Sequence, residues 1–182
     1  MKLFPEGRSF VVSAAAMTVT AAAAYMTCRS LSELVDFLYF YRSASFYPAL
    51  AHSKLPMGMP PLAALLARHM VLSFYFSFFF WLSAAVLAAG VWRRREWARR
   101  GAVAMCYVIS AAAAMLLLFP WLVVPEPFVY GGVSLAPEFN AMVRSAAFLV
   151  RLAAFTGGGL CLWWALALDR GAARKEFPAG SK

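Results

Sequence analysis

Histidine, cysteine and acidic residues are scarce in this chain, and their scarcity excludes several classes of protein. The 182 residues include two histidines, three cysteines and eight acidic residues. His52 and His69 lie in different segments, so neither a haem nor a zinc ion has an evident set of ligands. Cys28, Cys106 and Cys161 form no Cys-x-x-Cys pair, which argues against a dithiol oxidoreductase with paired cysteines in its outer loops. We therefore expect no metal and no cofactor.

Motifs for hydrolysis and phosphoryl transfer are absent as well. The chain has no serine nucleophile motif and no glycine-rich phosphate loop. Glu33 and Asp36 are three residues apart, close enough on a helix to act as a pair. Two acids on the wet face of a surface helix are, however, ordinarily solvated. The sequence indicates no reaction and favours a protein that is not an enzyme.

Apolar residues, in contrast, are abundant. The chain is 63% hydrophobic and only 14% charged, a composition that a soluble domain of this length could not bury. A helix crosses about 30 Å of hydrocarbon with about 20 residues. Four apolar runs reach that length: residues 9–28, 70–92, 101–120 and 146–168. They predict one all-α domain, an integral membrane four-helix bundle.

Basic residues give this bundle an orientation. Between the second and third runs lies the cluster Arg93-Arg94-Arg95-Glu96-Trp97-Ala98-Arg99-Arg100, the turn of a helical hairpin. The same side of the predicted bundle also carries Lys2, Arg8, Arg170, Arg174, Lys175 and Lys182, whereas the longer connections on the other side carry only Arg29, Arg42, Lys54, Arg68 and Arg144. By the positive-inside rule, both termini and the arginine-rich turn are cytosolic. The net charge of +9 thus reflects topology, and we expect no nucleic-acid partner.

The turn also suggests a source. A span that ends in Gly90-Val91-Trp92 and continues into Arg-Arg-Arg-Glu-Trp-Ala-Arg-Arg resembles the turns of many small bacterial membrane proteins. The likeness covers about ten residues and implies no activity. We expect a bacterial inner membrane as the location.

The first run has a second interpretation. Residues 1–24 have a basic start and end in Ala22-Ala23-Ala24, which are features of a cleaved signal peptide. The apolar run of about 20 residues is longer than a signal core, and Glu6 does not suit a basic leader. We expect a retained span.

Two further segments are predicted outside the spans. Ser30-Leu31-Ser32-Glu33 matches a helix capping box, and Leu31, Leu34, Val35 and Leu38 recur at helical spacing. They predict a separate amphipathic helix over residues 31–41 that lies on the outer membrane surface. The polar residues 171–182 predict a disordered tail.

Two stripes of small residues are candidate helix-packing faces. Ala14, Thr18 and Ala22 share one stripe of the first span, and Ala153, Gly157 and Cys161 share one stripe of the last. Small residues at four-residue spacing allow the backbones of membrane helices to approach closely. We expect the first and last spans to pack against each other.

Several charged residues are predicted to form one outer layer. Arg151 lies about one helical turn inside the last span and, with Arg144, Arg68 and His69, lies at the depth of the outer interface. Glu33 and Asp36 belong to the connection above it. One hypothesis is a pocket in which Arg151 and Arg144 hold a lipid phosphate or a carboxylate. The alternative is a structural network of ion pairs.

Two functions from different classes follow. The first is a non-catalytic accessory protein that recognises a membrane-protein partner, or a second copy of itself, through small-residue helix faces. The second is a lipid or small-anion binder, or carrier, that uses the outer arginine layer. Charge within the spans is sparse, whereas a carrier of polar cargo keeps polar groups near the midplane, so the accessory role is favoured.

Overall fold

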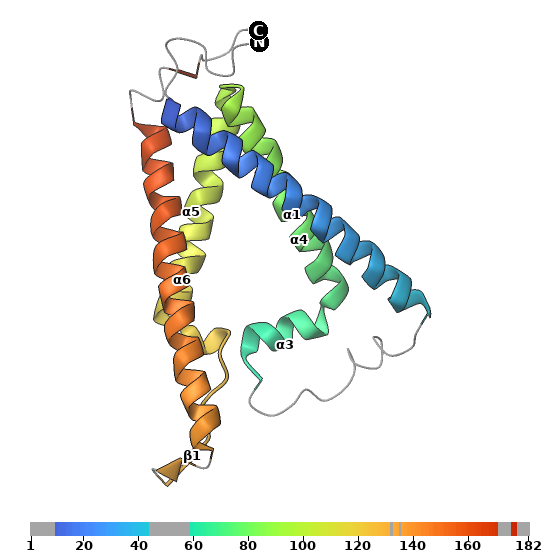
Figure 1. The fold of residues 1–182 in the computed structure, drawn as a ribbon, viewed down its shortest axis with the longest axis vertical. Helices are drawn as coiled ribbons and strands as arrows, with labels where there is room; N and C mark the ends of the chain where they lie inside the picture. The colour runs from blue at the N-terminus through green and yellow to red at the C-terminus, as the bar shows by residue number, and fades with distance from the viewer. Residues whose placement is uncertain (1–9, 44–58, 132, 135, 171–175, 178–182) are drawn as a thin grey trace.

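The computed structural model describes residues 10–43, 59–131, 133–134, 136–170 and 176–177. The long helices are α1 (Phe10–Ser43), α4 (Met70–Trp92), α5 (Glu96–Leu118) and α6 (Pro137–Asp169), as Figure 1 shows. The shorter elements are helix α3 (Pro61–Arg68), the 3-10 turn η1 (Pro120–Leu122) and the two-residue strands β1 (Val129–Tyr130) and β2 (Val133–Ser134). The N-terminal part of the candidate leader, His52 and most of the predicted tail lie outside the described residues.

The four long helices have the dimensions of membrane spans. Each is long and apolar enough to cross a bilayer, and little of each apolar window is buried inside the protein. A helix satisfies all its backbone hydrogen bonds internally, which hydrocarbon requires. The chain therefore has the architecture of a multi-pass membrane protein.

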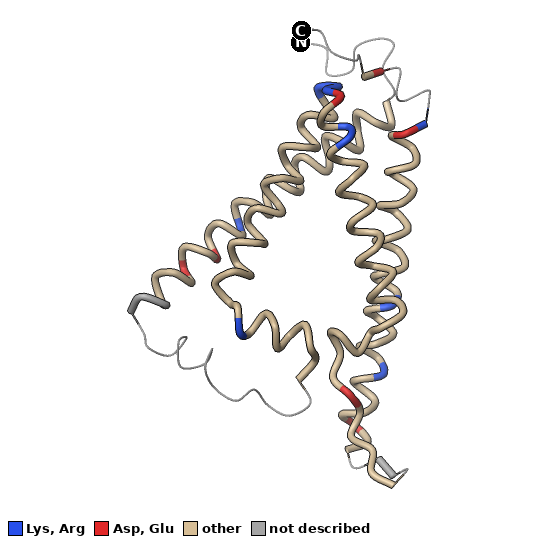
Figure 2. Tube along the Cα trace, turned by 180° about the vertical axis from the view of Figure 1, so that it is seen from behind, with Lys and Arg blue, Asp and Glu red and all other residues tan. Residues whose placement is uncertain are grey.

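The spans form two antiparallel pairs and do not close into one four-helix bundle. Helix α1 packs along α4, and α5 packs along α6. Figure 1 shows the two pairs joined at one end and splayed apart at the other, with α3 running across the wide end. The joined end, called the basic end below, holds the turn from Arg93 to Arg95, the start of α1 and the end of α6 (Figure 2).

Helix α1 corrects the prediction of a separate surface helix. Residues 31–41 are helical, but they continue the first span without a break, so α1 is 34 residues long. Leu34 and Phe37 are buried, and the ring of Phe37 stacks on Phe74 of α4 at 4.6 Å. The apolar face of this segment, which was predicted to contact lipid, packs against α4 instead.

The small-residue face of α1 is also not the predicted one. Ala14 is half-buried, and Thr18 and Ala22 are exposed. The row toward α4 alternates spacings of four and three residues and consists of Ala16, Thr20, Ala23, Thr27, Ser30, Leu34 and Phe37. This is the seam of a left-handed helix pair, in which the stripe recurs every 3.5 residues and not every four.

Helices α5 and α6 approach closely at a glycine. An added Cβ at Gly158 would lie 2.6 Å from the Cβ of Ala113, so only glycine allows this distance. At the same point the hydroxyl of Ser110 donates a hydrogen bond to the Gly158 carbonyl oxygen at 3.0 Å. The predicted stripe is displaced by one position: Ala153 and Gly157 are exposed, and Cys161 alone is half-buried. The predicted packing of the first span on the last is wrong, since α6 packs along α5.

The wide end is closed by short elements. Helix α3 ends at Arg68, the chain turns at His69 with φ −117° and ψ 43°, and α4 begins at Met70. Helix α3 contacts η1, which follows α5. The transverse helix of the first outer connection is thus residues 61–68, not residues 31–41.

Candidate functional site

The predicted outer layer does not come together. Arg144 and Arg151 lie on α6, Arg68 and His69 lie at the α3–α4 junction, and the acids Glu33 and Asp36 lie on α1. All six are exposed, and Figure 2 shows the charges of α1 and α6 on different arms. Glu33 pairs with Arg29 of its own helix at 2.9 Å. Among the described residues, no hydrogen bond or ion pair joins the members of this layer.

The organised polar cluster is instead at the basic end, where two arginines of the turn are buried. Arg99 has a side chain that is 5% exposed. Its guanidinium donates two hydrogen bonds to the Glu96 carboxylate, at 2.8 and 2.9 Å. It also donates to the Leu168 carbonyl oxygen at 3.3 Å and pairs with Asp169 at 3.1 Å. Arg99 therefore ties the first turn of α5 to the last turn of α6.

Arg94 makes the corresponding contacts toward α1. It has a positive φ of 57°, a left-handed conformation that is unfavourable for a residue with a Cβ. Its guanidinium donates to the Ser13 hydroxyl at 3.0 Å and pairs with Glu176 at 2.9 Å. Glu176 and Phe177 belong to the segment predicted to be a disordered tail, and Phe177 is only 4% exposed. That prediction is wrong for these two residues, because a buried guanidinium and an apolar cluster hold them.

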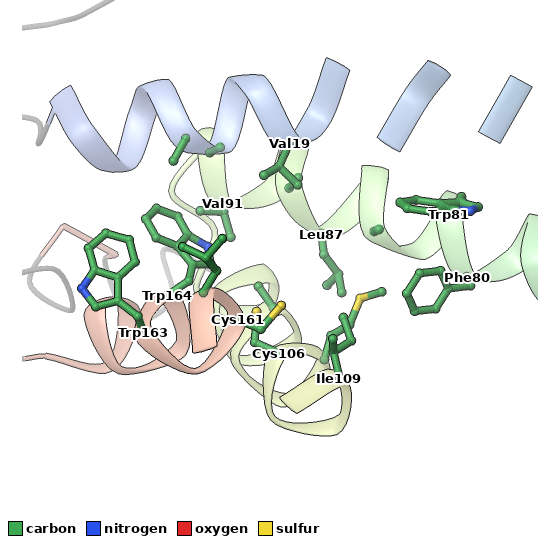
Figure 3. Close-up of a pocket in the computed structure, with 17 residues that line it drawn as sticks. Val19, Phe80, Trp81, Leu87, Val91, Cys106, Ile109, Cys161, Trp163 and Trp164 are labelled. Atoms are coloured by element: carbon green, nitrogen blue, oxygen red, sulfur yellow. The ribbon is translucent and has the colours of Figure 1, made fainter. Parts of the chain in front are cut away.

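An apolar cleft opens between the two helix pairs near the basic end, and Figure 3 shows it. Its volume is about 520 Å³, within the range of sites that hold one small molecule. All four spans contribute to its wall. The lining residues are Ala15, Ala16, Val19, Phe80, Trp81, Ala84, Leu87, Ala88, Val91, Ala102, Met105, Cys106, Ile109, Leu160, Cys161, Trp163 and Trp164.

Two cysteines stand in the wall of the cleft. Cys106 of α5 and Cys161 of α6 are both half-buried free thiols, and their sulfurs face each other in Figure 3. Apart from the indole N–H groups of the tryptophans, the rest of the lining is apolar. The described residues include no group of three or more histidines, cysteines or acids that could hold a metal ion. The cleft is thus built to contact apolar groups.

The exposed small residues extend the walls of this cleft. On α6, Ala153 and Gly157 lie on the same helix face as Leu160 and Trp164, which line the cleft. An added Cβ at Gly157 would meet none of the residues that the structure describes within 4 Å. On α1, Ala22 follows Ala15 and Val19 on one face and is exposed. The small faces of α1 and α6 therefore border the opening between the arms, where none of the described residues covers them.

Sequence reasoning missed both the cleft and the buried arginines. The sequence analysis interprets the basic turn mainly as an orientation signal, although Glu96 among five arginines is a sign of local pairing. The cleft left no sign in the sequence, because its lining residues are ordinary membrane-span residues from four helices.

Comparison of the chain with protein-family models, with curated proteins and with solved structures finds no match. The site must therefore be interpreted from its own geometry.

Proposed function

We propose that this chain is a non-catalytic accessory protein of a membrane, which docks one transmembrane helix of a partner protein against the apolar cleft. The location that the sequence indicates is a bacterial inner membrane, with both termini in the cytosol. The observation that carries the proposal is the opening between the two helix pairs, bordered by exposed small residues on α1 and α6.

Small exposed residues favour a helix as the occupant. In lipid, helices associate through close packing, because burial from lipid gives no hydrophobic gain. Gly157 and Ala153 offer a flat strip about one turn long, and among the described residues nothing lies within 4 Å of the position of an added Gly157 Cβ. Ala84 and Ala88 of α4, which line the cleft, are small as well. A partner helix could approach both walls at backbone distance.

A bound lipid chain is the second candidate, and the volume of the cleft supports it. About 520 Å³ suits one acyl or prenyl chain better than a whole helix, which would lie along the opening and only partly enter the cleft. The anion pocket of the outer arginine layer has less support, because Arg144 and Arg151 share α6 while the other members of the layer lie on other elements.

Photo-crosslinking in native membranes tests the proposal. The photoreactive residue p-benzoylphenylalanine replaces either Phe80, which lines the cleft, or its neighbour Phe79, which is 57% exposed and is not among the lining residues. We expect a cross-linked protein of fixed mass from position 80 and none from position 79. Equal products from both positions would mean random encounters, and a lipid adduct confined to position 80 would favour the second candidate.

Gly157→Leu provides the second test. The new side chain enters open space, so we expect thermal stability to stay unchanged while the partner is lost from the gently extracted complex in native mass spectrometry. Retention of the partner in this variant would contradict docking on the α6 strip.

A further inference from the structure

Glu176 and Phe177 lie beyond the end of α6 and fold back onto the basic turn. The Glu176 carboxylate pairs with Arg94 at 2.9 Å, where the two side chains are 19% and 4% exposed. The Arg94 guanidinium lies over the Phe177 ring, 5.4 Å from its centroid. One arginine therefore holds both residues, the first by charge and the second by a cation–π contact.

Arg94 is itself tied to the other arm of the molecule. Its hydrogen bond to Ser13 reaches the first turn of α1, and its left-handed backbone conformation turns the chain between α4 and α5. The path from Ser13 through Arg94 to Glu176 thus links the start of α1 to the segment that follows α6. Helices α1 and α6 belong to different helix pairs.

Phe177 adds an apolar contact at the same place. It belongs to a buried cluster to which every span contributes: Val12 and Ala16 of α1, Val91 of α4, Ala98 of α5 and Leu168 of α6. Ala16 and Val91 also line the apolar cleft. The ring of Phe177 is therefore part of the packing that ends the cleft at the basic end.

We propose that Glu176 and Phe177 form a releasable latch that fixes the separation of the two helix pairs. Apart from the turn, the pairs are joined mainly by the contact of α4 with α5, and at the wide end by the small contact of α3 with η1. At the joined end, the latch adds a contact between Glu176 and Phe177 and the start of α1, through Arg94. Its release lets the arms change their angle and changes the width of the cleft. This device does not depend on which ligand or partner occupies the cleft.

Distance measurements by double electron–electron resonance test the latch. Spin labels are attached at Tyr25→Cys on α1 and Phe155→Cys on α6, which are 67% and 69% exposed and lie on opposite arms. Cys28, Cys106 and Cys161 are replaced by alanine in this background, and the purified full-length chain is measured in lipid nanodiscs. The latch variant is Glu176→Gln with Phe177→Ala. The matched control is Glu138→Gln with Phe148→Ala, the same changes at exposed positions of α6.

We expect one narrow distance distribution in the parent and in the control, and in the latch variant a broader distribution whose mean shifts by several ångströms. Phe177→Leu, which keeps an apolar side chain, should lie between parent and latch variant. Circular dichroism checks that the helices persist in each variant. If the double variant loses helical structure, the distance measurement uses Glu176→Gln alone as the latch variant. Identical distributions in parent and latch variants, or equal broadening in the control, would overturn the proposal.

Discussion

Gly158 allows the sharpest test of the structure, because two neighbouring glycines provide its controls. A methyl group at position 158 would lie 2.6 Å from the Ala113 Cβ, well inside van der Waals contact. Helices α5 and α6 must then separate, which also stretches the hydrogen bond from Ser110 to the Gly158 carbonyl oxygen. At Gly157 and Gly159 the same methyl group meets nothing within 4 Å in the described part of the chain.

An added methyl group has two effects of opposite sign on the free energy of unfolding. Alanine is favoured over glycine inside a helix by about 0.5 to 1 kcal/mol, so Gly157→Ala and Gly159→Ala should be neutral or slightly stabilising. Overpacking a close contact costs about 1 to 3 kcal/mol. The loss of a hydroxyl bond between membrane helices adds about 0.6 kcal/mol. We therefore expect Gly158→Ala to lower the free energy of unfolding by about 1 to 3 kcal/mol relative to either control.

Unfolding by sodium dodecyl sulfate in mixed micelles, followed by tryptophan fluorescence, measures these differences. Adding Ala113→Gly to Gly158→Ala removes the opposing methyl group and should restore most of the lost stability. If Gly158→Ala behaved like Gly157→Ala, the α5–α6 contact described above would be wrong. A double variant no more stable than Gly158→Ala alone would show that the loss has another cause.

Three further predictions concern contacts between helices. Arg99→Ala removes the buried guanidinium that joins Glu96 to the Leu168 carbonyl oxygen and Asp169, and should cost about 1 to 3 kcal/mol in unfolding free energy. Arg100→Ala, whose side chain is 71% exposed, should cost under about 1 kcal/mol. Equal losses would refute the buried network. Ser77→Ala removes a 3.2 Å hydroxyl contact between α4 and α1 and should cost about 0.6 kcal/mol; a loss of several kcal/mol would indicate another role. A short membrane-permeant bis-maleimide should link Cys106 to Cys161 in native membranes. The link is detected because the two fragments stay together after the connection between α5 and α6 is cleaved. Fragments that separate would contradict the placement of the two cysteines.

The sequence predicted the spans because their signal is local. A run of about 20 apolar residues must be helical in hydrocarbon wherever it packs, so α4 and α5 appear close to the predicted bounds. The predicted break before residue 31 failed because the capping-box residues have other partners. The Ser30 hydroxyl meets Ser77 of α4 at 3.2 Å, and Glu33 pairs with Arg29 at 2.9 Å. The polar side chains of this capping motif therefore bond to other side chains and not to the backbone of a helix end.

The packing faces and the polar cluster could not be predicted, because they depend on contacts between residues that are far apart in the sequence. Gly157 and Gly158 are adjacent and equivalent in the sequence, and only the position of Ala113 on another helix distinguishes them. Glu176 is far from Arg94 along the chain, so their ion pair follows from the fold alone. The outer arginine layer assumed that equal depth means proximity, which holds in a closed bundle and fails when the two helix pairs diverge.

The length of α1 and α6 has a consequence for how the protein meets its bilayer. With 34 and 33 residues, each helix is about 50 Å long, against about 30 Å of hydrocarbon. Tilt within the usual range, up to about 40°, cannot absorb that difference. If the basic end marks the cytosolic boundary, roughly the C-terminal third of α1 and the N-terminal third of α6 project from the opposite leaflet. These projecting parts carry Glu33, Asp36 and Arg144, whose charges are then solvated by water and require no pocket of partner side chains.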